Sequence, residues 1–322
     1  FAEKMNVPVV TTIMGKGAIA TTHPLYIGNT GMHGKYASNK AVSECDVLFS
    51  IGTRFNDRIT GDLNEFAPKA KIVHIDVDTA SISRNVVVDV PVVSDANLAL
   101  EKLLEWAESK DTEQWQKEIA EWDKKNPLEM RRDCGMTPQM VFEHVNRTFR
   151  EAVYVTDVGQ HQMWATQYLE LDSWHQLITS GGLGTMGFGF PAAIGAKIGN
   201  RDKEVVCFTG DGGFQMNIQE LETIHRLNLP IKIFVLNNQG YAQIHATQKN
   251  IFQGHYVACD ADSHLTLSPI SAVAGAYGLK TLQIHSNEEL QERVKETLDY
   301  DGPVICEVMV PIDLSAFPKQ VS

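Results

Sequence analysis

The sequence predicts an α/β protein built from two doubly wound parallel-sheet domains. Short apolar runs rich in β-branched residues alternate with stretches whose apolar residues recur at helical spacing. Several of these runs end in Gly, Asp or Asn. The alternation indicates βαβ units, in which helices cover both faces of a parallel sheet. A length of 322 residues fits two domains of ordinary size.

The first domain is expected to span residues 1–105. Its predicted strands are VPVVTT, DVLFSIG, KIVHIDVD and VPVVSD, at residues 7–12, 46–52, 71–78 and 90–95. Between them, ASNKAVSEC and SDANLALEKLLEWA show helical spacing. The opening FAEKMNVPVV has the character of a helix end that runs into a strand, and no initiator Met precedes it. We therefore expect this domain to be N-terminally incomplete.

Residues 106–136 differ from the segments on either side. Trp115, Ile119 and Trp122 recur at helical spacing in a charged stretch that begins at Trp106, and a Pro at 127 follows it. This pattern predicts an amphipathic connecting helix. The tryptophans are interpreted as packing anchors, and the charges as a solvated face.

The second domain is expected to span residues 137–322. Thr137 followed by Pro138 is typical of a helix start. Its predicted strands are AVYVTDVG, QLITSGG, EVVCFTGDG, IKIFVLNN and PVICEVMV. In open α/β sheets the ligand crevice lies at the carboxyl ends of the strands, where these runs place Gly, Asp and Asn.

Composition narrows the class of partner and the compartment. The net charge is −12, so non-specific binding to nucleic acid is not expected. No apolar run has the length needed to cross a bilayer, which excludes an integral membrane protein. An odd number of cysteines without a C-x-x-C motif argues against a disulfide framework or a zinc site: Cys45, Cys134, Cys207, Cys259 and Cys306. This usage favours a cytoplasmic protein.

The most informative segment joins a GDGG turn to an NNQG turn through one helix. The strand EVVCFT delivers Asp211 to its end, FQMNIQELETIHRL is expected to form the returning helix, and IKIFVL delivers Asn237 and Asn238. One βαβ crossover should make Asp211 and Asn238 neighbours, and such oxygen ligands suit Mg²⁺. The glycines and the helix N-terminus favour a bound diphosphate. The alternative is that Asp211 caps a helix and the asparagines form an ordinary turn.

These motifs resemble a known family. GDG followed at this spacing by NN is the signature of thiamine-diphosphate decarboxylases and carboligases. GQHQMW (159–164) and SGGLGTMGFGFPAAIGA (180–196) are similar to the C-terminal domain of acetolactate synthase catalytic subunits. MGKGA (14–18), GMHG (31–34), RFNDRITG (54–61) and FAPKAKIVHIDVD (66–78) are similar to the central, FAD-binding domain of that family. The resemblance covers nearly the whole chain.

The resemblance implies a set of residues for thiamine diphosphate and Mg²⁺. Asp211, Asn238 and the carbonyl of Gly240 would hold Mg²⁺. Met186 would be the apolar wedge that bends the cofactor so that its 4′-imino group can deprotonate its reactive carbon. The remaining cofactor contacts would be Gly159, Gln160, His161, Gly184, Gly210, Gly212, Gly213 and Tyr241. Without the resemblance, Met186 is equally well a core gap-filler and His161 a core histidine.

The resemblance also implies a structural FAD and a substrate contact in the first domain. The FAD site would be lined by Gly31, Met32, His33, Gly34, Arg54, Asp57, Asp76, Asp78 and Asp95. Arg58 would recognise the carboxylate of a second 2-ketoacid. On their own, Asp76 and Asp78 are solvated acids at a strand end, and Arg58 pairs with Asp57 or Asp62 on the surface.

The implied activity is decarboxylation of pyruvate and transfer of the hydroxyethyl carbanion to a second 2-ketoacid, in branched-chain amino-acid biosynthesis. A homodimer or homotetramer and a small regulatory subunit are implied partners. Two departures qualify this. The family's activating glutamate lies in an N-terminal domain outside this sequence, so this chain alone is expected to be inactive. Thr247 stands where many members have Trp, so preference for 2-ketobutyrate is in doubt, and a keto-sugar acceptor stays open.

Two alternatives from other classes remain. Gly182, Gly184 and Gly187 fit G-x-G-x-x-G, the pattern of a dinucleotide-dependent oxidoreductase. The acid expected about twenty residues later is missing at a strand end, because Glu204 begins a strand. A non-enzymatic cofactor-binding half that needs a partner polypeptide is the other alternative.

Overall fold

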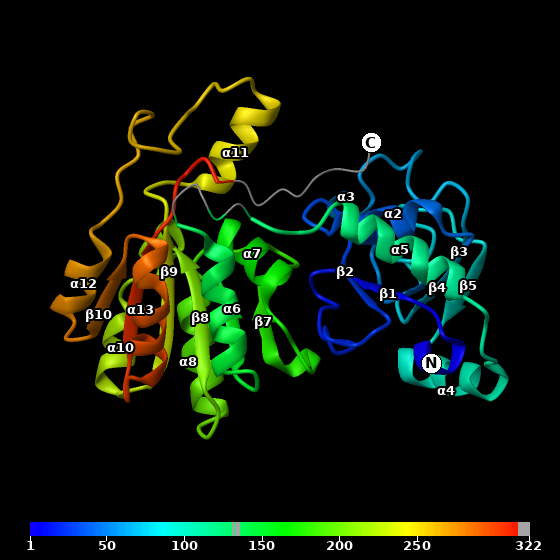
Figure 1. The fold of residues 1–322 in the computed structure, drawn as a ribbon, viewed down its shortest axis with the longest axis horizontal. Coiled ribbons are helices and arrows are strands. Elements are labelled where there is room, and N and C mark those ends of the chain that lie inside the picture. Colours follow the sequence, from blue (N-terminus) through cyan, green and yellow to red (C-terminus); the bar gives the residue numbers. More distant parts are fainter. Residues whose placement is uncertain (131, 133–135, 315–322) are drawn as a thin grey trace. The chain divides into compact units, whose positions relative to one another are not determined.

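A computed structural model describes residues 1–130, 132 and 136–314, which form two compact units. Unit 1 contains residues 1–15 and 22–128, and unit 2 contains residues 16–21 and the described residues from 129 onward. Both units are α/β with parallel strands, as predicted (Figure 1). Cys134 lies outside the described residues.

Unit 1 has two small parallel sheets, where we expected one. Strands β1 and β2 form a pair, and β3, β4 and β5 form the second sheet with β4 in its centre. The strands are β1 (Val9–Thr11), β2 (Tyr26–Asn29), β3 (Val47–Ile51), β4 (Lys71–Asp76) and β5 (Val90–Val93). The helices are α1 (Ala2–Met5), α2 (Tyr36–Glu44), α3 (Asp57–Thr60), α4 (Ala96–Trp106) and α5 (Glu113–Lys125).

The predicted connecting helix is α5, and it packs within unit 1. Ile119 is buried against α2, with Trp115 and Trp122 beside it. The two tryptophan rings meet edge to face at 5.4 Å, so both anchor the helix by packing. The interpretation of Trp106 as a packing anchor is wrong, because it ends α4 with 82% of its surface exposed.

Unit 2 is a six-stranded, fully parallel sheet in the order β10-β11-β9-β8-β6-β7. Its strands are β6 (Val153–Thr156), β7 (Leu177–Thr179), β8 (Val205–Gly210), β9 (Ile231–Asn237), β10 (Lys280–Ile284) and β11 (Val304–Met309). Its helices are α6 (Pro138–Thr148), α7 (Gln160–Tyr168), α8 (Gly189–Gly199), α9 (Asp211–Met216), α10 (Glu220–Arg226), α11 (Ala242–Ile251), α12 (Ile270–Ala276) and α13 (Asn287–Asp299), with a 3₁₀ turn at Trp174–Gln176.

Helices cover both faces of this sheet, which makes unit 2 doubly wound. Alternate residues of β8 enter opposite cores: Val206 and Phe208 pack with α6, α7 and α13, while Val205 and Cys207 pack with α8, α10 and α12. A strand buried on both faces reads as a continuous apolar run, as EVVCFT does. Full burial of such side chains contributes about 1.5–3 kcal/mol each and fixes the strand positions.

The helix expected after the GDGG turn differs from the prediction. It begins at Asp211 itself and is broken into α9 and α10 around Asn217. The side-chain amide of Asn217 donates to the carbonyl oxygen of Gly187 over 2.6 Å. This contact ties the break to the loop that carries Met186. Among the described residues, no helix has both the length and the apolar character that crossing a membrane requires.

Candidate functional site

Four loops of unit 2 meet at one edge of the sheet. They follow β6, β7, β8 and β9, which are neighbours, and parallel strands bring their carboxyl ends to the same side. The chain runs from β6 outward to β7 and returns to β8 on the other side of β6. This reversal is a topological switch point, where open α/β sheets bind ligands.

Asp211 stands at the end of β8 and is 4% exposed. Oδ1 accepts a hydrogen bond from the amide of Gly212 over 2.8 Å, and Oδ2 accepts one from the amide of Gly240 over 3.0 Å. Burial raises the pKa of Asp211 to about 6, and the backbone hydrogen bonds oppose that rise. A nearby positive charge favours the ionised form of a buried carboxylate. Asp211 is therefore suited to bind a cation.

The loop after β9 is held in a specific conformation. Asn237 Oδ1 accepts from the amide of Gln239 over 2.9 Å, and Gln239 is left-handed with φ of 58°. Asn238 is partly exposed at the tip. A Cβ at Gly240 would clash with the carbonyl oxygen of Cys259, so the close approach there requires glycine. The structure therefore brings Asp211 and the Asn238–Gly240 loop together, as predicted from the βαβ spacing.

Gly212 forms a cradle between two other loops. A Cβ on Gly212 would lie 2.5 Å from Cε1 of Tyr241 and 3.1 Å from Cε of Met186. Met186, on the loop after β7, is 36% exposed. The three residues predicted for cofactor binding from separate segments thus lie side by side, with the Met186 side chain at the surface of the site.

The loop after β6 lies against the loop after β8. A Cβ at Gly210 would be 2.9 Å from Nδ1 of His161, and a Cβ at Gly159 would be 2.8 Å from its Cε1. Burial lowers the pKa of His161 to about 4, with Asp157 opposing, and so favours the neutral imidazole. His161 Nε2 and Gln160 Oε1 are buried, and neither has a hydrogen-bond partner among the described residues. Buried polar atoms of this kind suit a ligand that supplies the missing partner.

Asp157 organises the loop that carries Met186. It is 1% exposed, and its carboxylate accepts from the amides of Val158 over 2.8 Å, Gly187 over 3.0 Å and Gly189 over 2.7 Å. These charge-assisted bonds link the end of β6 to the loop after β7 and fix the backbone that directly follows Met186. We did not single out Asp157 from the sequence. Its signal was available, since it follows a buried strand just as Asp211 does.

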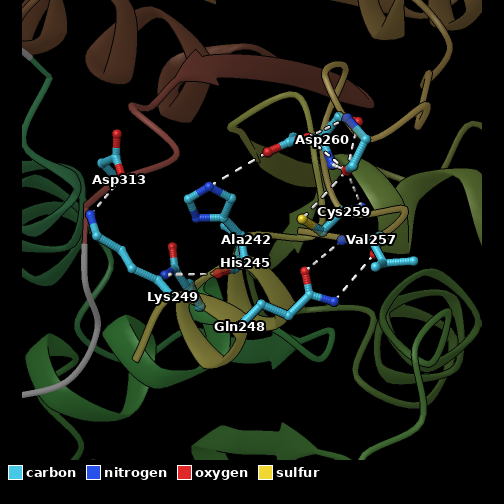
Figure 2. Close-up of polar contacts among 10 residues, drawn as sticks. Ala242, His245, Gln248, Lys249, Val257, Cys259, Asp260 and Asp313 are labelled. Atoms are coloured by element: carbon cyan, nitrogen blue, oxygen red, sulfur yellow. Dashed lines mark hydrogen bonds and ion pairs between the residues drawn. The ribbon is translucent and has the colours of Figure 1, made fainter. Parts of the chain in front are cut away.

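The segment that follows α11 folds back onto the start of that helix. Tyr241 donates its amide to the carbonyl of Cys259 over 2.8 Å, and His245 lies 3.5 Å from Asp260 (Figure 2). The ring of His245 also stacks on Tyr256 at 4.2 Å. The Thr247 hydroxyl donates to the carbonyl of Gln243 over 3.0 Å within the helix. Thr247 therefore offers a small, partly exposed surface rather than a large apolar one.

In unit 1, the predicted FAD residues fall into two groups. The first group is a close pair of loops: the amide of Met32 donates to the carbonyl of Arg58 over 2.8 Å, and a Cβ at Gly31 would lie 2.5 Å from that oxygen. His33, Gly34 and Arg54 belong to these loops, and Asp57 begins α3, the helix that carries Arg58. The Arg58 guanidinium pairs with Asp57 at 3.5 Å, and both side chains are mostly exposed.

The second group consists of acids at strand and helix ends. Asp76 ends β4 and accepts from the amide of Asp78 over 2.8 Å. Asp78 accepts from Ala80 and Ser81, which lowers its pKa. Asp95 caps α4 through the amides of Asn97 and Leu98. These contacts are those of turns and caps, so a role in FAD binding stays a prediction.

The loops of unit 2 indicate the class of cofactor that this protein binds. A carboxylate and an adjacent amide-bearing loop, a glycine cradle beside Met186 and unpartnered buried polar atoms fit a diphosphate held through Mg²⁺. Residues 157–308 match "Thiamine pyrophosphate enzyme, C-terminal TPP binding domain", and residues 1–103 match "Thiamine pyrophosphate enzyme, central domain". The chain belongs to the thiamine pyrophosphate enzymes.

Within this family, the chain is similar to acetolactate synthase large subunits. It is 38% identical to the large subunit of Cyanidium caldarium over 98% of this chain and 55% of that protein. It is 41% identical to the probable large subunit of Methanococcus aeolicus, over 96% of this chain and 54% of that protein. It is 39% identical to the large subunit of Haemophilus influenzae, over 100% of this chain and 57% of that protein. The chain thus spans about half the length of the curated relatives it matches. The G-x-G-x-x-G run lies inside the TPP-binding match.

Proposed function

We propose that the full protein is a thiamine-diphosphate- and Mg²⁺-dependent carboligase of the acetolactate synthase type. It would decarboxylate pyruvate and transfer the two-carbon unit to a second carbonyl compound. The observation that carries this proposal is the convergence of Asp211, the Asn238–Gly240 loop and the Gly212–Met186–Tyr241 cradle at one sheet edge. Family membership supports the same cofactor.

The residues of unit 2 divide the binding work. Asp211, Asn238 and the carbonyl of Gly240 would hold Mg²⁺, and Gly159, Gln160, His161, Gly212 and Gly213 would contact the diphosphate. Met186, whose loop Asp157 holds through the amides of Gly187 and Gly189, would support the bent shape of the cofactor. When bound, thiamine diphosphate supplies a nucleophilic carbon and a sink for the electron pair left when CO₂ departs. The protein would orient the cofactor and surround it with buried, preorganised polar groups.

We infer that unit 1 carries a structural FAD against the paired loops at 31–34 and 54–58. The close approach of Gly31 to the Arg58 carbonyl supports a built loop pair, and Gly31 has a positive φ of 104°. Absorption spectra of the purified protein test this inference. A flavin band that disappears in Gly31→Ala would support the site, while a wild-type protein without a flavin band would refute it.

We propose that the full protein is a cytoplasmic homodimer or homotetramer. A small regulatory subunit is also proposed, because the relatives are large subunits by name. The carboxylate that activates the cofactor would come from outside residues 1–322. Arg58 would recognise an acceptor carboxylate once its exposed pairing with Asp57 is exchanged.

The identity of the acceptor substrate depends in part on Thr247. A partly exposed threonine cannot supply the apolar contact of tryptophan, and one pocket contact is worth about 1–3 kcal/mol of discrimination. Proton NMR of the products that the full protein forms from pyruvate alone, and then with 2-ketobutyrate or a keto-sugar in competition, tests this. Acetolactate from pyruvate alone would establish the carboligase. If pyruvate is untouched, the acetolactate synthase activity is refuted, and a different donor or a sugar acceptor takes its place.

The variant Thr247→Trp sharpens the test. It should raise the share of product formed with 2-ketobutyrate over pyruvate by about tenfold, the effect of roughly one pocket contact. Asn250→Trp, at an exposed position of the same helix, serves as the control. An equal shift in both variants would show that Thr247 does not contact the acceptor.

A further inference from the structure

A buried carboxylate lies on the strand next to β9, the strand that leads into the Asn238–Gly240 loop. The proposed reaction gives this carboxylate no role. Glu307 is in β11, between β9 and β10, and is 5% exposed. It is opposite Val235 of β9 and Gln283 of β10 in the register. Its neighbours Cys306 and Val308 are fully buried in the apolar core. Burying a carboxylate is costly unless its oxygens are satisfied, so the surroundings of this side chain are informative.

Three neutral side chains satisfy both oxygens of Glu307. Oε1 accepts from the side-chain amide of Asn237 over 2.7 Å. Oε2 accepts from the hydroxyl of Ser271 over 2.5 Å and from the amide of Gln283 over 2.8 Å. The donors come from β9, α12 and β10. None of them carries a positive charge, so the group is a hydrogen-bonded carboxylate and not an ion pair.

Asn237 transmits this arrangement to the metal loop. Its amide nitrogen donates to Glu307, and its amide oxygen accepts from the backbone of Gln239 over 2.9 Å. That second bond holds Gln239 in its left-handed conformation. Gly240 follows directly and donates its amide to Asp211. Hydrogen bonds, joined by the peptide link between Gln239 and Gly240, thus connect the core of the sheet to the carboxylate of the proposed metal site.

The chemical nature of residue 307 determines which way Asn237 points. An ionised carboxylate only accepts hydrogen bonds, so the NH₂ group of Asn237 must face it and the oxygen must face Gln239. A glutamine at 307 has its own NH₂ group, which removes this constraint. If Asn237 reversed, its NH₂ group would oppose the backbone N–H of Gln239, and the turn would lose its hydrogen bond.

We propose that Glu307 is a positioning residue of the metal site, which acts through Asn237 to set the geometry of the Asn238–Gly240 loop. The inference rests on the proposed Mg²⁺ site. Residues that orient metal ligands typically change metal affinity by 10–100-fold when they are replaced. Glu307 therefore sets the affinity for a divalent cation without touching it.

The test measures binding of Mn²⁺, as a paramagnetic probe for Mg²⁺, to the protein in the presence of a fixed excess of thiamine diphosphate. Glu307→Gln should weaken binding by about 10–100-fold. Ser271→Ala is the matched control: it removes one hydrogen bond to the same carboxylate but leaves the Asn237 bond, so its affinity should equal that of the wild type. Thermal unfolding of all variants without metal separates loss of stability from loss of affinity.

A second variant guards against misfolding of Glu307→Gln and tests the path. Asn237→Ala should weaken binding as much as Glu307→Gln, and combining the two should add nothing. Wild-type affinity in Glu307→Gln, equal losses in Glu307→Gln and Ser271→Ala, or additive losses in the double variant would each overturn the inference. A wild-type protein that does not bind Mn²⁺ would instead overturn the metal site itself, and with it this role.

Discussion

The backbone amide of Gly240 donates a hydrogen bond to Oδ2 of Asp211 over 3.0 Å, although the residues are 29 positions apart. The bond exists because β8 and β9 are parallel neighbours whose carboxyl ends coincide. With Oδ1 held by the amide of Gly212, both oxygens of Asp211 are oriented, and each keeps acceptor capacity for a cation. The site is therefore preorganised by the backbone before any ligand binds.

Gly212→Ala should abolish binding of thiamine diphosphate. The added Cβ would lie 2.5 Å from Tyr241 and 3.1 Å from Met186, so both must move and the cradle must open. Calorimetric titration with the cofactor in Mg²⁺ measures the loss. Gly195→Ala in α8 is the control, because its Cβ meets nothing within 4 Å and alanine favours a helix. Normal binding by Gly212→Ala would show that the cradle does not hold the cofactor.

Asp157→Asn should destabilise unit 2. The amides of Val158, Gly187 and Gly189 converge on this carboxylate, and an asparagine offers one oxygen in place of two. Losing a buried hydrogen bond costs about 1–3 kcal/mol. Urea unfolding measures the difference from the wild type. Asp202→Asn, an exposed acid before β8, should leave the unfolding free energy unchanged, and a similarly small effect for Asp157→Asn would contradict the role of this side chain.

The burial of Lys16 should make the free energy of unfolding depend on pH. The side chain is 4% exposed, and burial lowers its pKa from 10.5 to about 7, with Glu170 opposing. Between these two values the unfolded state binds more protons than the folded state. The contribution of Lys16 to the free energy of unfolding therefore rises as pH increases from about 7 to about 10.5, and below about 7 the full burial penalty applies.

Lys16→Met removes this titration and keeps the apolar stem. At neutral pH the variant should be more stable than the wild type, and the difference should shrink as pH rises toward 10.5. Denaturant unfolding at a series of pH values measures the difference. A stability difference that stays constant across this pH range would contradict the lowered pKa of Lys16.

Most strand positions of unit 2, and the approach of the Asn238–Gly240 loop to Asp211, could be predicted because they depend on local patterns. EVVCFT and IKIFVL are apolar runs buried on both faces, and their ends deliver Asp211 and Asn238. The predicted family is confirmed by the match to the thiamine pyrophosphate enzymes.

Features that depend on tertiary contacts escaped prediction. The break between α9 and α10 depends on the bond from Asn217 to Gly187, which no local propensity encodes. Glu307 lies in the predicted strand PVICEVMV. Its hydrogen bonds could not be predicted, because its partners come from three other elements. Strand β10 was missed because KTLQI has only two apolar residues, Leu282 and Ile284, and lacks the continuous apolar run of the predicted strands.

The most direct test of the account is the titration of thiamine diphosphate into the purified protein with Mg²⁺ and with excess EDTA, for the wild type and Asp211→Asn. Saturable binding is predicted only for the wild type in Mg²⁺, because the carboxylate of Asp211 would hold the cation that neutralises the diphosphate. Asp202→Asn should bind as the wild type does. Undiminished binding by Asp211→Asn, or wild-type binding that is indifferent to EDTA, would contradict the account.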